Sequence, residues 1–196
     1  MGQGPLRVMF IMLIAASTAA CGTGAPNPPP SLTPSPTPSP TSLPAATSYD
    51  EFAASFCSAF EALFGAVGNP DTAAWSEPSL ALDAAVAAHD GVAADRLAEQ
   101  IIGELESGRR DVAIGGGWPP GAPVMDQLDR VFVAFEAWTT AKVALAKGEP
   151  GAIDPQVAFE GAGGVEAWHA MFEAGRAMSS QRPGEGHHCA NVPIGI

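Results

Sequence analysis

The fold is decided by residues 48–67, SYDEFAASFCSAFEALFGAV. Phenylalanine recurs at every fourth position, at Phe52, Phe56, Phe60 and Phe64. This spacing places the four rings on one face of an α-helix, and such a face is normally buried in a core. The segment opens with the Ser-x-x-Glu spacing of a capping box, which predicts that the helix starts next to residue 48.

The residues that follow repeat the helical pattern. We expect helices over about 78–88, from a cap at Asp90 to just beyond Arg109 and Arg110, over 123–147, from the Asp154-Pro155 cap, and over 165–179. The inner face of the last helix is predicted to hold Val165, Trp168, Phe172 and Met178. Glycine-rich segments at 115–121 and 161–164 predict a loop and a helix break. No segment alternates apolar and polar residues, so the sequence predicts an all-α bundle of four to five helices.

The charge of the chain narrows the range of partners. The formal net charge is −12, and every acidic residue lies at Asp50 or later. An acidic surface repels phosphate backbones, so nucleic acid is not expected as a partner. The same charge disfavours direct docking on anionic lipid head groups.

The N-terminal 20 residues read as a signal peptide. Arg7 precedes an apolar run over residues 8–16, which is too short to span a bilayer and is typical of a cleaved signal. Small residues then lead to Cys21, and Ala19-Ala20-Cys21-Gly22 resembles the lipobox of bacterial lipoproteins. Thr18 stands where that family usually has leucine. The resemblance implies a lipid on Cys21 and a position at the cell membrane, on its extracytoplasmic face. Ordinary secretion, with Cys21 free or paired, is the alternative.

Residues 21–48 contain the cysteine and a proline-rich linker, and residues 49–196 form the predicted helical domain. The linker has almost no apolar surface to bury, so we expect it to be disordered. Proline at alternate positions favours polyproline II, and about 24 such residues reach roughly 75 Å. This length suits a spacer between a membrane anchor and a domain.

The remaining cysteines, Cys57 and Cys189, form a pair if Cys21 carries a lipid. Exported domains commonly oxidise such pairs, so a disulfide is predicted. The alternative is a metal site formed by Cys189 with His187 and His188.

No catalytic motif is found in the sequence. It lacks the Gly-x-Ser-x-Gly elbow, a phosphate-binding loop and His-Glu-x-x-His. We therefore name no catalytic residue, expect no cofactor and expect that the protein is not an enzyme.

Two groups of residues remain as candidate sites. Glu166, His169 and Glu173 share one flank of a predicted helix and are the candidate metal ligands, with a solvated flank as the alternative. Trp118 lies in a proline-rich loop, where it either contacts a partner or closes the end of the bundle. The sequence thus predicts a membrane-anchored lipoprotein whose helical domain binds an unidentified extracytoplasmic protein. A small-ligand or metal-binding module is the alternative, and an enzyme is less favoured.

Overall fold

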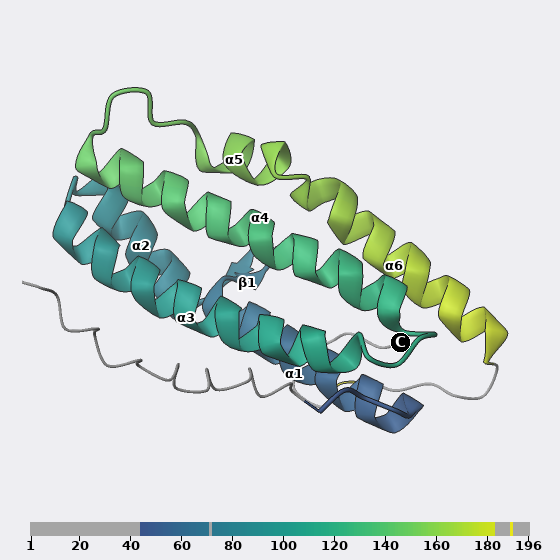
Figure 1. Ribbon diagram of the computed structural model, residues 1–196. Coiled ribbons are helices and arrows are strands. Elements are labelled where there is room, and N and C mark those ends of the chain that lie inside the picture. The colour runs from purple at the N-terminus through teal and green to yellow at the C-terminus, as the bar shows by residue number, and fades with distance from the viewer. Residues whose placement is uncertain (1–43, 71, 183–188, 190–196) are drawn as a thin grey trace, which may run out of the picture. The chain divides into compact units, whose positions relative to one another are not determined.

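A computed structural model describes residues 44–70, 72–182 and 189, all within one unit that spans Thr41–Ile196. This part of the chain is helical, which confirms the predicted all-α class (Figure 1). Its helices are α1 (Tyr49–Ala66), α2 (Glu77–Ala87), α3 (Gly91–Gly115), α4 (Ala122–Lys147), α5 (Pro155–Gly161) and α6 (Gly164–Gln181). The described part therefore holds six helices where a bundle of four to five was expected. The additional element is α5, a helix of seven residues that begins at the predicted Asp154-Pro155 cap.

The start of α1 follows the cap that the sequence predicts, with one difference. The Ser48 side chain accepts a hydrogen bond from the Glu51 backbone N–H, as in a capping box. The Glu51 carboxylate, however, accepts from the backbone N–H and the hydroxyl of Thr47, at 2.7 and 2.9 Å. These bonds, led by the Thr47 backbone N–H, lower the pKa of Glu51.

The phenylalanine face of α1 forms the centre of the core. Phe52, Phe56 and Phe60 are fully buried, and Phe64 packs at the edge. Successive ring centroids along the helix lie 6.1, 4.7 and 5.6 Å apart. Aromatic pairs at these separations attract one another beyond simple burial. The periodicity of residues 48–67 is thus realised as tertiary packing.

Helix α4 is the central helix of the fold, and α2, α3, α5 and α6 all pack against it. It packs against α3 on one side and against α5 and α6 on the other, while α1 packs against α3 (Figure 1). It ends at Gly148, whose φ of 66° is left-handed and free of cost for glycine. The turn beyond it begins the connection to α5.

A short hairpin follows α1, where the sequence predicted only a helix end. Strand β1 (Gly68–Asn69) pairs antiparallel with β2 (Ala74–Trp75), so that Gly68 lies opposite Trp75. Two residues per strand are too few to produce a visible alternation, so the hairpin escaped the sequence pattern. The hairpin positions the Trp75 ring on α4.

Three further details refine the sequence expectation. Helix α3 continues to Gly115, so Arg109 and Arg110 lie inside it rather than near its end. The glycine break is confirmed, because α5 ends at Gly161 and α6 begins at Gly164. Val165 was expected on the inner face of α6 but is exposed.

Candidate functional site

The candidate site is an open apolar groove between α4 and α5, here called the α4–α5 groove. It has a volume of about 570 Å³. Its lining consists of Ala137, Thr140, Ala141, Ala144, Glu149, Pro150, Gly151, Ala152, Ile153, Val157, Ala158 and Gly161. Small-molecule sites in proteins typically occupy about 300–1,000 Å³, so the groove has the size of a ligand site.

The groove exists because the facing side chains are short. The α4 face contributes Ala137, Ala141 and Ala144, which are spaced by four and three residues and so share one side of the helix. Alanine ends at Cβ, and the surface of α4 is therefore low along this line. Asp154 caps α5 by accepting from the backbone N–H groups of Gln156 and Val157, which fixes the opposite wall.

The rim of the groove exposes large apolar side chains. Ile153 is 52 % exposed and Val157 is 57 % exposed. Covering apolar surface is favourable by about 25 cal/mol per Å², and exposed apolar side chains gathered at a concavity commonly mark a binding surface. The groove therefore favours an apolar occupant.

Polar groups are few along the groove. Thr140 donates its hydroxyl hydrogen to the Glu136 carbonyl at 2.9 Å, which leaves its oxygen as an acceptor. Glu149 is the one charged residue of the lining. Its neighbour Lys147 pairs with Asp95 at 2.8 Å. The groove thus offers acceptors and a negative charge, but no cation.

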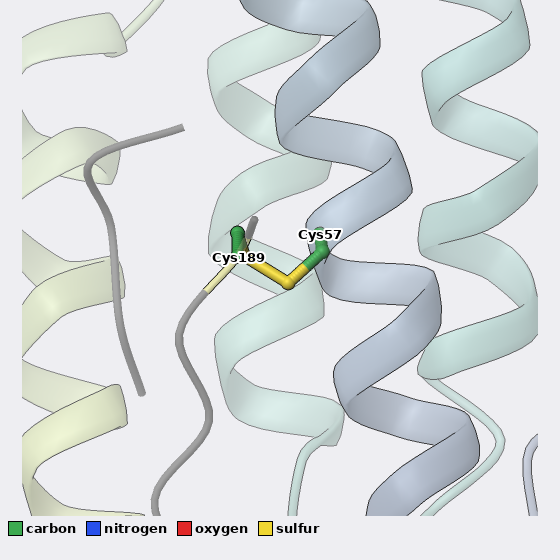
Figure 2. The surroundings of a disulfide bond; sticks show 2 residues. All are labelled: Cys57 and Cys189. Carbon is green, nitrogen blue, oxygen red and sulfur yellow. A yellow bond between two sulfur atoms is a disulfide. The ribbon is translucent and has the colours of Figure 1, made fainter. Parts of the chain in front are cut away.

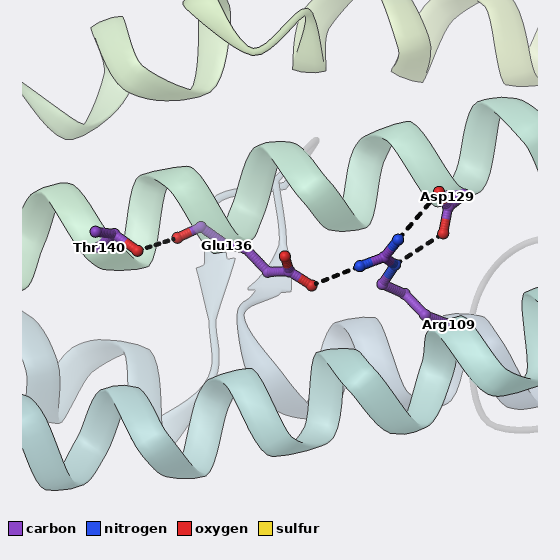
Figure 3. A network of polar contacts seen from close by, with 4 residues as sticks. All are labelled: Arg109, Asp129, Glu136 and Thr140. Carbon is purple, nitrogen blue, oxygen red and sulfur yellow. Dashed lines mark hydrogen bonds and ion pairs between the residues drawn. The ribbon is translucent and has the colours of Figure 1, made fainter. Parts of the chain in front are cut away.

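A charged network joins α3 to α4 (Figure 3). Arg109 holds Asp129 through Nε at 2.8 Å and Nη2 at 3.3 Å, and its Nη1 lies 3.3 Å from Glu136. The hydrogen bonds and charge of Asp129, followed by Glu136, raise the pKa of Arg109 above its ordinary value. The sequence analysis assigned no role to Arg109, whereas in the structure this residue clamps α3 to α4.

A second polar cluster joins α2 to α4. The Lys142 side chain is buried, with Nζ 3.5 Å from the centroid of the Trp138 ring and paired with Asp83. The Trp75 ring stacks on Trp138 at 5.9 Å. Burial lowers the pKa of Lys142 despite the opposing effect of Asp83. The sequence analysis missed this cluster. The pattern that could have indicated it is Lys142 four residues after Trp138, which places the lysine on the buried side of the predicted helix.

The predicted cysteine pair is present. Cys57 in α1 and Cys189 form a disulfide with a Cα–Cα distance of 5.2 Å (Figure 2). The sulfur of Cys189 is therefore occupied, which removes it from the alternative metal site. His187 and His188 lie outside the described residues, as do Cys21, the signal segment and residues 22–43 of the linker.

Trp118 closes the end of the bundle. Its side chain is 6 % exposed, with ring centroids 5.1 Å from Phe52 and 5.7 Å from Tyr49. The Arg182 guanidinium lies 4.9 Å from the Trp118 ring. The ring is therefore used for packing, as in the alternative in which Trp118 closes the end of the bundle.

The candidate metal ligands do not converge on a site. Glu166, His169 and Glu173 are all exposed on α6. Among the described residues, no group of three or more His, Cys, Asp or Glu side chains is placed to hold a metal ion. The structure thus places these three residues on the solvated flank that was their alternative interpretation.

Comparisons with known proteins add no relative. No protein-family model matches the chain, and no curated protein or solved structure is similar to it. Within the described part of the chain, none of the helices has the length and hydropathy needed to cross a membrane.

Proposed function

We propose that this protein is an extracytoplasmic lipoprotein, held at the cell membrane through a lipid on Cys21, and that its helical domain is a binding domain. The α4–α5 groove is the observation that carries the binding role. It is concave and apolar, its rim exposes Ile153 and Val157, and its size fits a ligand site. The Ala19-Ala20-Cys21-Gly22 segment supports the anchor.

The disulfide supports export. Bridges between cysteines such as Cys57 and Cys189 persist in oxidising compartments and are rare in reducing ones. A spacer of about 75 Å, if extended, gives the domain reach beyond the membrane surface. A tethered binding domain combines these features with the absence of a catalytic motif in the sequence.

The anchor is tested by metabolic labelling of cells with a clickable fatty acid, followed by membrane fractionation. The wild-type chain is expected to carry the label and to sediment with membranes, and Cys21→Ser is expected to lose both properties. Thr18→Leu, which restores the usual lipobox residue, serves as the control that keeps them. Equal labelling of the wild type and Cys21→Ser would contradict the anchor.

The binding role is tested by placing a photo-crosslinking amino acid at Val157 on intact cells. Leu80 is the matched control, because it is 53 % exposed on α2 and lies outside the groove lining. A recurrent adduct from Val157 and none from Leu80 is expected. The same scatter of neighbours from both positions would contradict binding at the groove.

A small-ligand module is the second candidate. The groove volume of about 570 Å³ favours it, because this volume lies within the range of known small-molecule sites. The metal-binding form of this alternative has no such support, since Glu166, His169 and Glu173 are exposed and do not gather.

A further inference from the structure

We propose that the α4–α5 groove binds the hydrocarbon chain of a single-chain amphiphile whose head group is positively charged. This inference rests on the proposed binding function and names the ligand class for the same site. It follows from the form of the groove, from its lining and from the charge at one end.

The form of the groove selects a slender occupant. Ala137 and Ala144 are seven residues apart on α4, which corresponds to a length of about 10 Å. Along this length the α4 side contributes alanines and Thr140, so no long side chain divides the floor of the groove. A docked helix presents separate side chains at positions i, i+3, i+4 and i+7, each of which needs a pocket of its own. An unbranched alkyl chain matches a continuous apolar hollow of this length.

The lining selects a hydrocarbon. Alanine side chains line the α4 side, and Ile153 and Val157 stand on the other wall. Thr140 and Glu149 are the lining residues with polar side chains. An occupant rich in hydrogen-bonding groups would lose its bonds to water here and regain few of them. An alkyl chain has none to lose.

The charge selects a cation. The Glu149 carboxylate lines the groove, and its charge acts on Lys147, whose ammonium group is paired with Asp95 at 2.8 Å. Asp95 and Glu149 thus outnumber this one cation, and the end of the groove stays negative. Residues 148–161 contain Glu149, Asp154 and Glu160 and no lysine or arginine. The whole chain carries a net charge of −12. A carboxylate head group is repelled at this end of the groove, whereas an ammonium group is attracted.

Calorimetric titration of the purified, disulfide-intact chain with alkyltrimethylammonium ions tests the proposal. Ions with six to fourteen carbons are used below their micelle concentrations, alongside alkyl carboxylates of the same lengths. Affinity is expected to rise by up to about fourfold per added methylene until the groove is full, and then to level off. The ammonium series is expected to bind at least tenfold more tightly than the carboxylate series. Equal affinity of both series, or no rise with chain length, would overturn the proposal.

Two variants place the binding in the groove. Gly161 lines the groove, and a Cβ added there meets no atom within 4 Å, so Gly161→Leu fills open space without a clash. It is expected to weaken ammonium binding at least tenfold. Gly103→Leu is the control, because Gly103 on α3 is equally unobstructed and lies outside the groove lining. Glu149→Gln is expected to reduce the preference for ammonium over carboxylate while leaving the dependence on chain length unchanged.

Thermal unfolding of each variant shows whether it is folded. A folded Gly161→Leu that binds like the wild type would overturn the groove as the site. If no amphiphile binds while the Val157 crosslink still returns a recurrent protein partner, the ligand class is wrong and the proposed function stands. If neither is found, binding at this groove is refuted together with the ligand class.

Discussion

The replacement of Gly108 by alanine measures how closely the helices approach one another. Gly108 lies inside α3 and is buried. A Cβ added there would lie 2.4 Å from Cζ and 2.6 Å from Cε1 of Phe132 on α4, and 3.1 Å from Cβ of Ala62 on α1. Carbon atoms pack at about 3.5–4.0 Å, so the Phe132 ring must retreat by more than about 1 Å. That ring is fully buried, and because protein interiors are close-packed it can retreat only by displacing its neighbours.

The expected magnitude has two opposing parts. Inserting a methyl group into a packed core costs about 1–3 kcal/mol. Alanine in place of glycine within a helix returns about 1 kcal/mol. We therefore expect Gly108→Ala to lower the free energy of unfolding by up to about 2 kcal/mol. Gly103→Ala, on the same helix but with no atom within 4 Å of the added Cβ, is expected to raise it by about 1 kcal/mol.

Urea denaturation followed by circular dichroism, with linear extrapolation to water, measures both variants. The difference between them isolates the steric cost, since the helix-propensity gain is common to both. Adding Phe132→Leu removes the ring atoms that clash, so the double variant is expected to recover part of the loss caused by Gly108→Ala. Equal stabilisation by the two alanines would refute the close approach of α1, α3 and α4.

The disulfide, the buried Lys142 and the Arg109 network give further predictions. Reduction of the Cys57–Cys189 bond, which links positions 132 residues apart, is expected to lower the free energy of unfolding by about 2–5 kcal/mol, and Cys57→Ala/Cys189→Ala should reproduce the loss; no change on reduction would contradict a stabilising bridge. Lys142 and Lys147 are the two lysines of the chain, so isotope labelling of lysine gives two NMR titration curves. Burial lowers the pKa of Lys142 and Asp95 raises the pKa of Lys147, so Lys142 should lose its proton at a lower pH than Lys147. The folded chain binds the Lys142 proton less tightly than the unfolded chain does. The free energy of unfolding of the wild type, relative to that of Lys142→Met, should therefore rise with pH between the lowered pKa and 10.5. A relative stability that falls over this pH range would refute the burial effect. Arg109→Ala is expected to cost no more than about 1 kcal/mol, and less in 1 M salt, because Arg109 and Asp129 are each more than a third exposed; a larger loss independent of salt would mean that the clamp acts by packing.

The sequence by itself determined the features that depend on local period and local chemistry. The phenylalanines of residues 52–64 repeat with the helical period, and Ser48, Asp90 and Asp154 cap helices wherever they precede free backbone N–H groups. The glycines near 148 and 161–164 end helices for equally local reasons. The cysteine pair followed from the number of cysteines and the resemblance at Cys21. The all-α class and the disulfide needed no knowledge of which helix packs on which.

The tertiary structure alone decided the sites. Ala137, Ala141 and Gly161 carry no chemical signal in the sequence, and they line a groove because the α4–α5 connection sets α5 beside a low face of α4. Arg109 and Lys142 looked like ordinary charged residues until α4 and α2 supplied their partners. For Trp118 the sequence left two alternatives open, and the packing of its ring on Phe52 and Tyr49 became visible only in the tertiary structure. Hydrophobic periodicity predicts which face of its own helix a residue occupies. What lies opposite that face depends on how loops of particular length direct one helix against another, and no local pattern carries that information.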